Sequence, residues 1–208
     1  MKLIGMLDSP YVRRVAISLK VLELPFEHLA LSVFRDFDEF SRYNSIVKAP
    51  TLVLDDGETL MDSSFILDYL DELAGPDKAL LPRSGDARRR SLVHIGRALA
   101  ACEKTVQIHY ERKLRPPEKI HQPWIDRCAN QLHCAYELLE QTAYQARPWL
   151  LGSRMTQADI TLGVAWRFTQ FIEPGLVDPG RYPHLAQFSA RCEALPVFAD
   201  TPVGQESP

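Results

Sequence analysis

Two short segments of this chain could together hold the backbone of a small peptide. They are Lys48-Ala49-Pro50 and, about a dozen residues later, Asp62-Ser63-Ser64. Pro50 opens an apolar run that predicts a strand, and proline suits an edge strand or the first strand position because it has no N–H group. A cis peptide bond at Pro50 would leave the backbone of the preceding residue open to a ligand. Asp62 and Ser63 are expected to begin a helix, which predicts an exposed strand edge beside a helix N-terminus.

Ser9 is a third residue with chemical potential. It lies between a predicted strand, residues 2–7, and a predicted helix, residues 10–22. Serine at the N-cap and proline at the first helical position are both favoured, so Ser9 and Pro10 mark the helix start. The free N–H groups and the dipole of a helix N-terminus favour an anion at this point.

Strands and helices alternate in the segments that must position these residues. The pattern predicts further strands at 25–31, 51–54 and 59–61, a short helix within 34–43, and a helix at 63–74. Asp56-Gly57 is typical of a hairpin turn between the last two strands. The order is β-α-β-α-β-β-α, a small mixed sheet with helices on its faces, and its first two strands should be parallel.

The second half of the chain shows only helical patterns. Helices are predicted at 86–114, 123–145, 159–172 and 183–195, and their length and order predict an all-helical bundle. Thr156-Gln157-Ala158-Asp159 has the pattern of a capping box. We interpret it as a structural element, with a catalytic acid at Asp159 as the alternative. The tail from Thr201 is expected to be poorly ordered.

Composition excludes several function classes. The chain has 208 residues and a net charge of −3, which gives no electrostatic footprint for nucleic acid or an anionic membrane. No apolar run approaches the ~20 residues of a membrane span, and no signal peptide is evident. The basic run Arg88-Arg89-Arg90 is interpreted as a solvated helical face. The four cysteines lack CxxC spacing, which indicates reduced thiols in a cytoplasmic protein, and the scattered histidines indicate no metal site.

This order of elements resembles the cytosolic glutathione S-transferases over nearly the whole chain, as a serine-type, bacterial-like member. Ser9-Pro10-Tyr11-Val12-Arg13 resembles the serine-containing first loop and helix of that superfamily, Lys48-Ala49-Pro50 its cis-proline segment, and Asp62-Ser63 its acidic-Ser motif. The resemblance implies a thioredoxin-like βαβαββα domain that binds glutathione (residues 1–76), a linker (77–85), and an all-helical domain that contributes the electrophile site (86–208).

Two positions depart from the family pattern. Members often carry Asn-Pro-x-Gly ahead of the cis-proline segment, but this chain has Asn44-Ser45-Ile46-Val47. Ala49 replaces the common Val or Ile. A ligand contact to the backbone of Ala49 tolerates that change, because its N–H and C=O groups are the same.

The resemblance assigns a role to each candidate residue. Ser9 would donate to the glutathione thiolate and, with the helix dipole, lower a thiol pKa of ~8.5 by ~2. Ser63 would hold the γ-glutamyl carboxylate, Asp62 would face the ammonium, and Lys48 would approach the glycyl end. Ala49 and Pro50 would bind the cysteinyl backbone. Without the resemblance, Ser9, Asp62 and Ser63 are better explained as helix caps, and the alternative for Lys48 is a surface lysine.

The second substrate has weaker candidates. Tyr11 follows Ser9 by two residues and could face an electrophile, and Tyr110 lies in the first long helix of the second half. For both tyrosines the alternative is ordinary packing or a surface position.

We therefore predict an enzyme that joins glutathione, as co-substrate, to a small hydrophobic electrophile without a metal, as a homodimer. A second possibility is a glutathione-dependent isomerase acting on maleyl compounds. It ranks lower because Asp8-Ser9-Pro10-Tyr11 lacks the Ser-rich, Cys-containing loop usual in those members. A third is a non-catalytic regulator that resembles the stringent starvation proteins, which bind RNA polymerase. A cysteine-type thiol transferase would need Cys in place of Ser9.

Overall fold

A computed structural model of the chain describes residues 1–204, and these residues form two compact units. The first contains residues 1–83 together with residues 194–204, and the second contains residues 84–193. This division differs from the expected one, which placed the C-terminal segment in the helical domain. The reason is Arg13, a buried side chain whose Nε donates to the carbonyl oxygen of Thr201 at 2.7 Å.

The expectation of a poorly ordered tail is wrong for its first residue. Thr201 is 2% exposed, and its hydroxyl donates to the carbonyl oxygen of Val197 at 2.9 Å. The end of the predicted tail, residues 205–208, lies outside the described residues.

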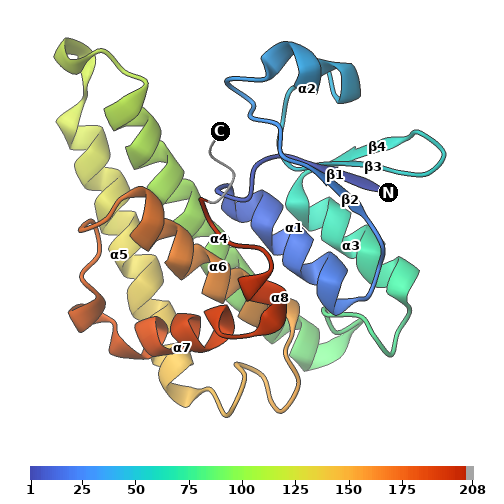
Figure 1. Ribbon diagram of the computed structural model, residues 1–208. Helices are drawn as coiled ribbons and strands as arrows, with labels where there is room; N and C mark the ends of the chain where they lie inside the picture. The colour runs from blue at the N-terminus through green and yellow to red at the C-terminus, as the bar shows by residue number, and fades with distance from the viewer. Residues whose placement is uncertain (205–208) are drawn as a thin grey trace. The chain divides into compact units, whose positions relative to one another are not determined.

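The first unit is built on a four-stranded sheet in the order β2-β1-β3-β4 (Figure 1). Its strands are β1 (Lys2–Ile4), β2 (Glu27–Leu29), β3 (Thr51–Val53) and β4 (Thr59–Met61). The predicted mixed sheet is confirmed, since β1 and β2 are parallel while β3 is antiparallel to both of its neighbours.

The position of Pro50 corrects one expectation. An edge strand is wrong, because β3 pairs with β1 on one side and β4 on the other. The start of a strand is right, because Pro50 immediately precedes the first paired residue, Thr51. Its missing N–H group therefore removes no ladder hydrogen bond.

Four helices complete the first unit, namely α1 (Pro10–Val21), α2 (Phe37–Tyr43), α3 (Ser63–Ala74) and the short α8 (Pro196–Ala199). Figure 1 shows α1 and α3 side by side on one face of the sheet, with α2 on the other side. Val12, Val15 and Leu19 recur at helical spacing on α1 and are all 0% exposed. Burial of each such side chain stabilises the unit by about 1.5–3 kcal/mol, which fixes the helix against the sheet.

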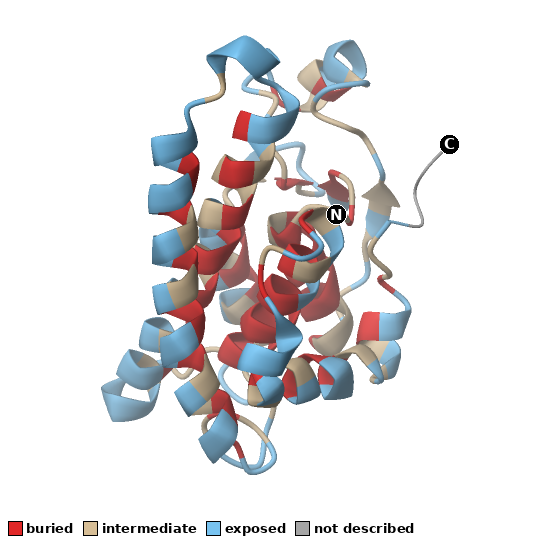
Figure 2. Ribbon diagram, turned by 90° about the vertical axis from the view of Figure 1, so that its left-hand side faces the viewer, coloured by how far each residue is buried: buried red, intermediate tan, exposed pale blue. Residues whose placement is uncertain are grey.

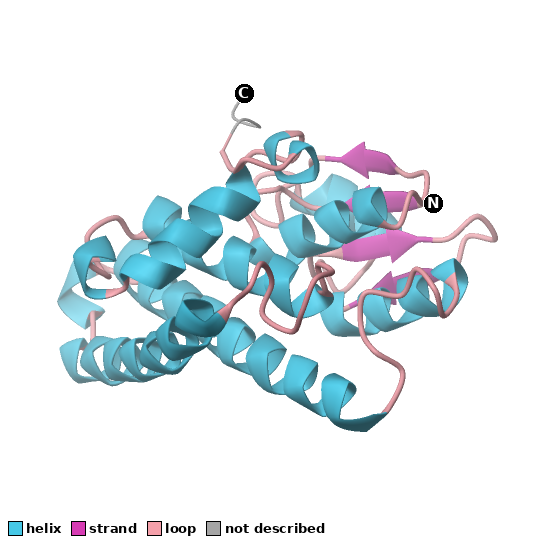
Figure 3. Cartoon of the chain, turned by 90° about the horizontal axis from the view of Figure 1, so that it is seen from below, coloured by secondary structure: helices cyan, strands magenta, loops and turns pink. Residues whose placement is uncertain are grey.

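The second unit is helical, as predicted. It contains α4 (Gly85–Lys113), α5 (Gln122–Gln145), α6 (Gln157–Ile172) and α7 (Pro183–Glu193), with short 3₁₀ turns at Pro117–Lys119 and Pro179–Arg181. Every strand among the described residues belongs to the first unit (Figure 3). Figure 2 shows buried residues along the inward sides of the helices and exposed residues along their outer sides. Among residues 1–204, no helix combines the length and the apolar character that crossing a membrane requires.

The predicted capping box at the start of α6 is confirmed. The N–H group of Thr156 donates to Asp159 Oδ2 at 2.8 Å, and the N–H group of Leu150 donates to Oδ1 at 2.8 Å. Asp159 is 0% exposed, and burial raises its pKa against the opposing effect of these hydrogen bonds. A carboxylate so enclosed serves the fold, and the structure gives no support to the alternative of a catalytic acid.

The four cysteines are free thiols, as predicted. Cys102, Cys128 and Cys192 are buried and Cys134 is exposed.

Candidate functional site

The sheet brings three chain segments to one edge. Ile4, the last residue of β1, pairs with Thr51, the first residue of β3, which in turn pairs with the last residue of β4. The chain therefore leaves β1 toward Ser9, enters β3 from Pro50 and leaves β4 into Asp62 at the same edge. The structure thus brings together the three segments that carry the candidate residues of the first half.

Gly5 allows two of these segments to approach closely. Its φ is +135°, and a Cβ at this residue would lie 2.6 Å from Val12 Cγ2 and 3.0 Å from Ala49 Cβ. Any side chain would therefore push the Ala49 loop away from the first turn of α1. The glycine is needed both for its backbone conformation and for this contact.

Ser9 occupies the predicted N-cap of α1. Its Oγ accepts a hydrogen bond from the N–H group of Val12 at 3.4 Å, longer than the usual ~2.9–3.0 Å. This bond uses the hydroxyl as an acceptor, so the O–H proton can still be donated to another group. The cap and the stabilisation of an anion, which the sequence offered as alternatives, are therefore compatible.

The loop before β3 is held by side-chain hydrogen bonds. The Ala49–Pro50 peptide bond is cis, as predicted. Thr51 Oγ1 donates to the carbonyl oxygen of Lys48 at 2.8 Å and accepts from Asn44 Nδ2 at 2.9 Å. Because Asn44 is 9% exposed, these bonds are shielded from water and fix the path of the chain into Pro50.

Val47 stands where the usual Asn-Pro-x-Gly pattern has its glycine, and its φ is +51°. This is the left-handed region, which a β-branched residue rarely adopts. The loop therefore has the backbone turn of a glycine-containing loop without the glycine.

Asp62 and Ser63 begin α3, as predicted. Asp62 is the N-cap, with Oδ1 accepting from the N–H group of Ser64 at 2.9 Å and Oδ2 lying 3.4 Å from Lys48 Nζ. Ser63 is 4% exposed, and its Oγ accepts from Arg14 Nη1 at 3.2 Å. The start of α3 therefore carries a carboxylate, a hydroxyl and a nearby guanidinium, in addition to its own N–H groups.

Sequence reasoning did not identify Arg14, Asn44 and Gly5. Arg14 is 2% exposed, and its guanidinium donates a hydrogen bond to the buried Oγ of Ser63. The available signal was the pair Arg13-Arg14 within the apolar pattern of a buried helix, where charged side chains need specific partners. No comparable local pattern in the sequence indicates the close approach of Gly5 and Ala49.

The two candidate tyrosines belong to different units. Tyr11 is half-buried on α1, and Tyr110 is 43% exposed on α4. Beside Tyr110, His109 Nδ1 lies 2.8 Å from Glu173 Oε1, which orients the imidazole. A role for either tyrosine toward a second substrate stays a prediction. Among the described residues, no group of three His, Cys, Asp or Glu side chains is arranged to hold a metal ion.

Two family models match this chain. Residues 3–78 match the glutathione S-transferase N-terminal domain, and residues 122–191 match the glutathione S-transferase C-terminal domain. The first match contains all the candidate residues at the sheet edge.

Two similar chains with solved structures, and one further relative by sequence, support the same relationship. A glutathione S-transferase from Methylobacterium radiotolerans, in complex with glutathione sulfonate, is 31% identical with a TM-score of 0.89, and the match covers 100% of this chain and 97% of that one. A glutathione transferase family member from Pseudomonas fluorescens, with bound S-(propanoic acid)-glutathione, is 29% identical with a TM-score of 0.84, covering 96% and 97%. A probable maleylacetoacetate isomerase from Vibrio cholerae is 28% identical over 217 residues, covering 95% of this chain and 93% of the relative.

Proposed function

The chain belongs to the glutathione S-transferase superfamily, and we propose that it activates the thiol of glutathione for attack on small electrophiles. The observation that carries this proposal is the meeting of Ser9, the Ala49–Pro50 segment and Asp62 at one edge of the sheet. The arrangement provides separate groups for each part of glutathione.

The start of α3 suits the γ-glutamyl end. A carboxylate there would accept from the Ser63 N–H group and be favoured by the helix dipole, with the Arg14 guanidinium adding positive charge behind Ser63. The ammonium group of the same residue would pair with Asp62. Two opposite charges on one amino acid therefore meet two complementary groups on neighbouring residues.

The rest of the peptide follows the loop before β3. The cysteinyl backbone would pair with the N–H and C=O groups of Ala49, in the manner of an added strand. The glycyl carboxylate would lie toward Lys48, whose side chain is 52% exposed and able to reorient.

Ser9 would then face the thiol. A hydrogen bond donated by its hydroxyl to the sulfur, together with the N-terminus of α1, favours the thiolate over the thiol. The thiolate forms a carbon–sulfur bond with the electrophile. With an aryl halide the halide leaves with its electron pair; with an epoxide the C–O bond opens onto its oxygen, and with an α,β-unsaturated carbonyl the double-bond electrons move to the carbonyl, and each of these two products takes up a proton from water. The protein itself forms no covalent intermediate, so its contribution is to bind glutathione and to stabilise the sulfur anion.

The test combines binding and turnover. Purified protein is expected to be retained on immobilised glutathione and to conjugate glutathione to members of a panel of aryl halides, epoxides and α,β-unsaturated carbonyls. Binding without turnover of any electrophile would contradict the enzymatic proposal and favour a non-catalytic regulator. Full retention of an Asp62→Ala variant would show that glutathione binds elsewhere.

Isomerisation is the second candidate, supported by the similarity to the Vibrio cholerae protein along nearly the whole chain. Here the thiolate would add to the double bond of a maleyl compound, the bond would rotate, and elimination would release glutathione unchanged. Conjugation consumes one glutathione per product and isomerisation consumes none. Following free thiol and substrate absorbance together, with a maleyl ketone as substrate, therefore distinguishes the two reactions.

A homodimer is part of the proposal, supported by exposed apolar side chains near the start and end of α3. Phe65 is 71% exposed and Leu73 is 51% exposed. Light scattering is expected to give twice the chain mass, and Phe65→Ser to shift the protein toward the monomer. Leu114→Ser, which removes a 58% exposed side chain at the C-cap of α4, is the matched control. A monomeric parent protein would contradict this part.

A further inference from the structure

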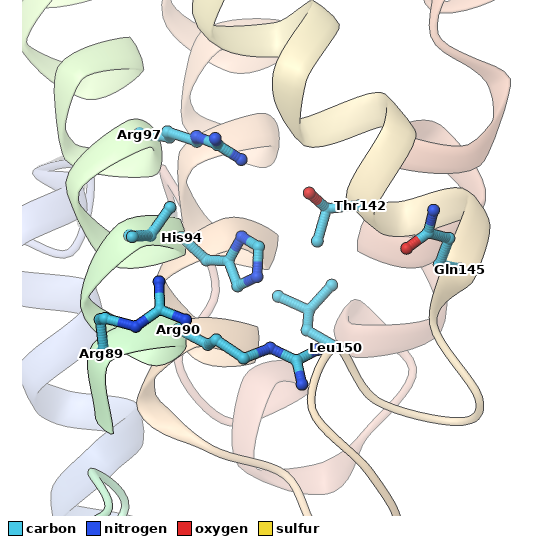
Figure 4. Close-up of a pocket in the computed structure, with 8 residues that line it drawn as sticks. Arg89, Arg90, His94, Arg97, Thr142, Gln145 and Leu150 are labelled. Atoms are coloured by element: carbon cyan, nitrogen blue, oxygen red, sulfur yellow. The ribbon is translucent and has the colours of Figure 1, made fainter. Parts of the chain in front are cut away.

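The second unit contains a cavity of about 240 Å³ between α4 and α5. Its polar lining comes from Arg89, Arg90, His94 and Arg97 on α4 and from Thr142 and Gln145 on α5. None of the described residues that line it is acidic. Figure 4 shows His94 and Arg97 pointing from α4 toward Thr142 across the cavity. Two members of the basic run that the sequence indicated as a solvated face therefore also form the wall of a pocket.

His94 carries a polar atom that the protein itself does not satisfy. Its Nδ1 is buried and has no hydrogen-bond partner among residues 1–204. Buried polar atoms are nearly always hydrogen-bonded, so an orphan beside a cavity marks a place for a ligand or water. Burial, reinforced by Arg97 and Arg90, lowers the pKa of His94, as expected where positive charge gathers.

Two of the three guanidinium groups have no counter-charge within the described residues. Arg89 pairs with Asp86, outside the cavity lining. Arg90 and Arg97 form no ion pair with any carboxylate in residues 1–204. Like charges that share a small volume repel each other, and an anion between them would remove that repulsion.

A neighbouring cavity in the same unit shows the contrast. It has a volume of about 260 Å³ and is lined by two arginines, Arg147 and Arg191. Arg147 already donates to the carbonyl oxygen of Ala146 at 2.6 Å, and Arg191 to that of Pro148 at 2.7 Å. Those guanidinium groups are used within the fold, whereas Arg90 and Arg97 remain available to a ligand.

We propose that the cavity between α4 and α5 is a binding site for a phosphate-type oxyanion the size of phosphate or diphosphate. At about 30 Å³ for each water, its volume corresponds to about eight water molecules, enough for a diphosphate and too little for a whole nucleotide. Guanidinium forks match the oxygens of a phosphate, and the side-chain amide of Gln145 adds a neutral donor opposite them. The anion is either free or the phosphate end of a larger molecule that extends into solvent.

Isothermal titration calorimetry of the full chain with sodium diphosphate, at an ionic strength of about 0.15 M, tests the site. Arg90→Gln and Arg97→Gln are each expected to weaken binding by about tenfold or more, because each removes a charge-assisted hydrogen bond. Arg127→Gln is the matched control, since it removes the same charge from an exposed position on α5 outside the cavity. Equal affinity for diphosphate and ADP indicates a free anion, and tighter binding of ADP indicates the phosphate end of a larger molecule.

A second readout reports on His94 itself. Its NMR titration is expected to shift to higher pH when diphosphate is bound, because the anion stabilises the imidazolium against Arg89, Arg90 and Arg97; the α5 residues that face it, Thr142 and Gln145, are uncharged. No heat with diphosphate would overturn the proposal. Equal weakening by Arg127→Gln, or an unchanged His94 titration, would also overturn it, since either would indicate general charge attraction.

Discussion

The ammonium group of Lys48 lies 3.4 Å from Oδ2 of Asp62, across the start of α3. Both side chains are partly exposed, at 52% and 40%, so their pairing adds no more than ~1 kcal/mol to stability. Under the proposed function, glutathione replaces this one ion pair by two, since its ammonium would pair with Asp62 and its glycyl carboxylate with Lys48. The pair therefore keeps both charges near their binding positions at little cost.

Asp62→Asn separates the charge of this residue from its role as a cap. Asparagine is a good N-cap and nearly isosteric with aspartate, so it meets the same backbone conformation (φ +71°, ψ 120°) and the melting temperature should change little. The affinity for glutathione should fall by about tenfold or more, because a charge-assisted bond to the ammonium is lost. Calorimetry and thermal unfolding measure the two effects. Asp62→Ala is the comparison, since it should lose both affinity and about 1 kcal/mol of stability. Undiminished affinity in Asp62→Asn would show that the ammonium group of glutathione does not pair with Asp62.

Ser9→Ala tests the stabilisation of the thiolate. At saturating glutathione, the pH profile of kcat/KM for the electrophile should move upward by about 1–2 units. At neutral pH this kcat/KM should fall by about 10–100-fold. The dissociation constant of glutathione should change little, because the other contacts remain. Ser9→Thr keeps the hydroxyl and should stay near the parent profile. A profile that is the same in Ser9→Ala and the parent would show that this hydroxyl does not act on the sulfur.

Arg14 and Ser63 should act as one unit in binding the γ-glutamyl carboxylate. Arg14 Nη1 donates to Ser63 Oγ at 3.2 Å within the buried interior, so either single change disturbs the other residue. In a double-mutant cycle of Arg14→Gln and Ser63→Ala on glutathione affinity, the coupling should be about 0.5–3 kcal/mol. The intact fold of each variant is checked by near-ultraviolet circular dichroism. Additive effects would show that Arg14 serves only the packing of α1.

Val47→Gly should stabilise the protein. A β-branched residue at φ of +51° destabilises the folded chain by about 1–2 kcal/mol. Glycine removes this strain but stabilises the unfolded chain by ~0.4–1 kcal/mol through its greater entropy, which is the smaller effect. The free energy of unfolding in urea should therefore rise by about 0.5–1 kcal/mol. Ile46 is the preceding residue, is exposed and has no positive φ. Ile46→Gly therefore relieves no strain and only raises the entropy of the unfolded chain, so it should lower the free energy of unfolding. A loss of stability in Val47→Gly as large as in Ile46→Gly would contradict the strain at Val47.

His94 should make stability depend on pH near its ordinary pKa of about 6.5. Burial, with Arg97 and Arg90, lowers the pKa of His94 in the folded chain, so the unfolded chain binds more protons in the window below that value. The contribution to stability is complete above about pH 6.5 and is lost as the pH falls toward the folded pKa. His94→Gln removes this term. In phosphate-free buffer, the parent should therefore lose stability relative to His94→Gln between about pH 7.5 and about pH 5.5.

His133 also has a pKa lowered by burial, but it is present in both proteins and its effect cancels. A difference in stability that does not vary with pH would show that His94 has the same pKa in the folded and unfolded chains.

Local patterns predicted most of the fold because the residues that decide it are adjacent. Asp62 as cap sets the start of α3, and the helix is observed at Ser63–Ala74, as predicted, with Gly75 at its C-cap. Asp56-Gly57 fixed the hairpin, and Ser9-Pro10 the start of α1. The candidate residues at the sheet edge were found for the same reason, since each lies at the beginning of an element.

Contacts between distant residues could not be predicted in this way. Arg14 and Ser63 are separated by 49 positions, and Arg13 and Thr201 by 188. A buried arginine shows in the sequence only as a charge within an apolar pattern, which says that it needs a partner but not which one. The internal place of β3 likewise depends on pairing with two strands, and a proline at a strand start is compatible with both an edge and an interior position.

The hydrogen bond from Arg13 to Thr201 has a consequence for synthesis on the ribosome. Domains generally fold as they emerge, N-terminal part first. In this chain the guanidinium of Arg13 finds the carbonyl oxygens of Phe198 and Thr201 only after residues 84–193 of the second unit have been added. The first unit is therefore completed last, and a nascent chain cut short at residue 193 would leave a buried cation without these acceptors, a ready target for quality control.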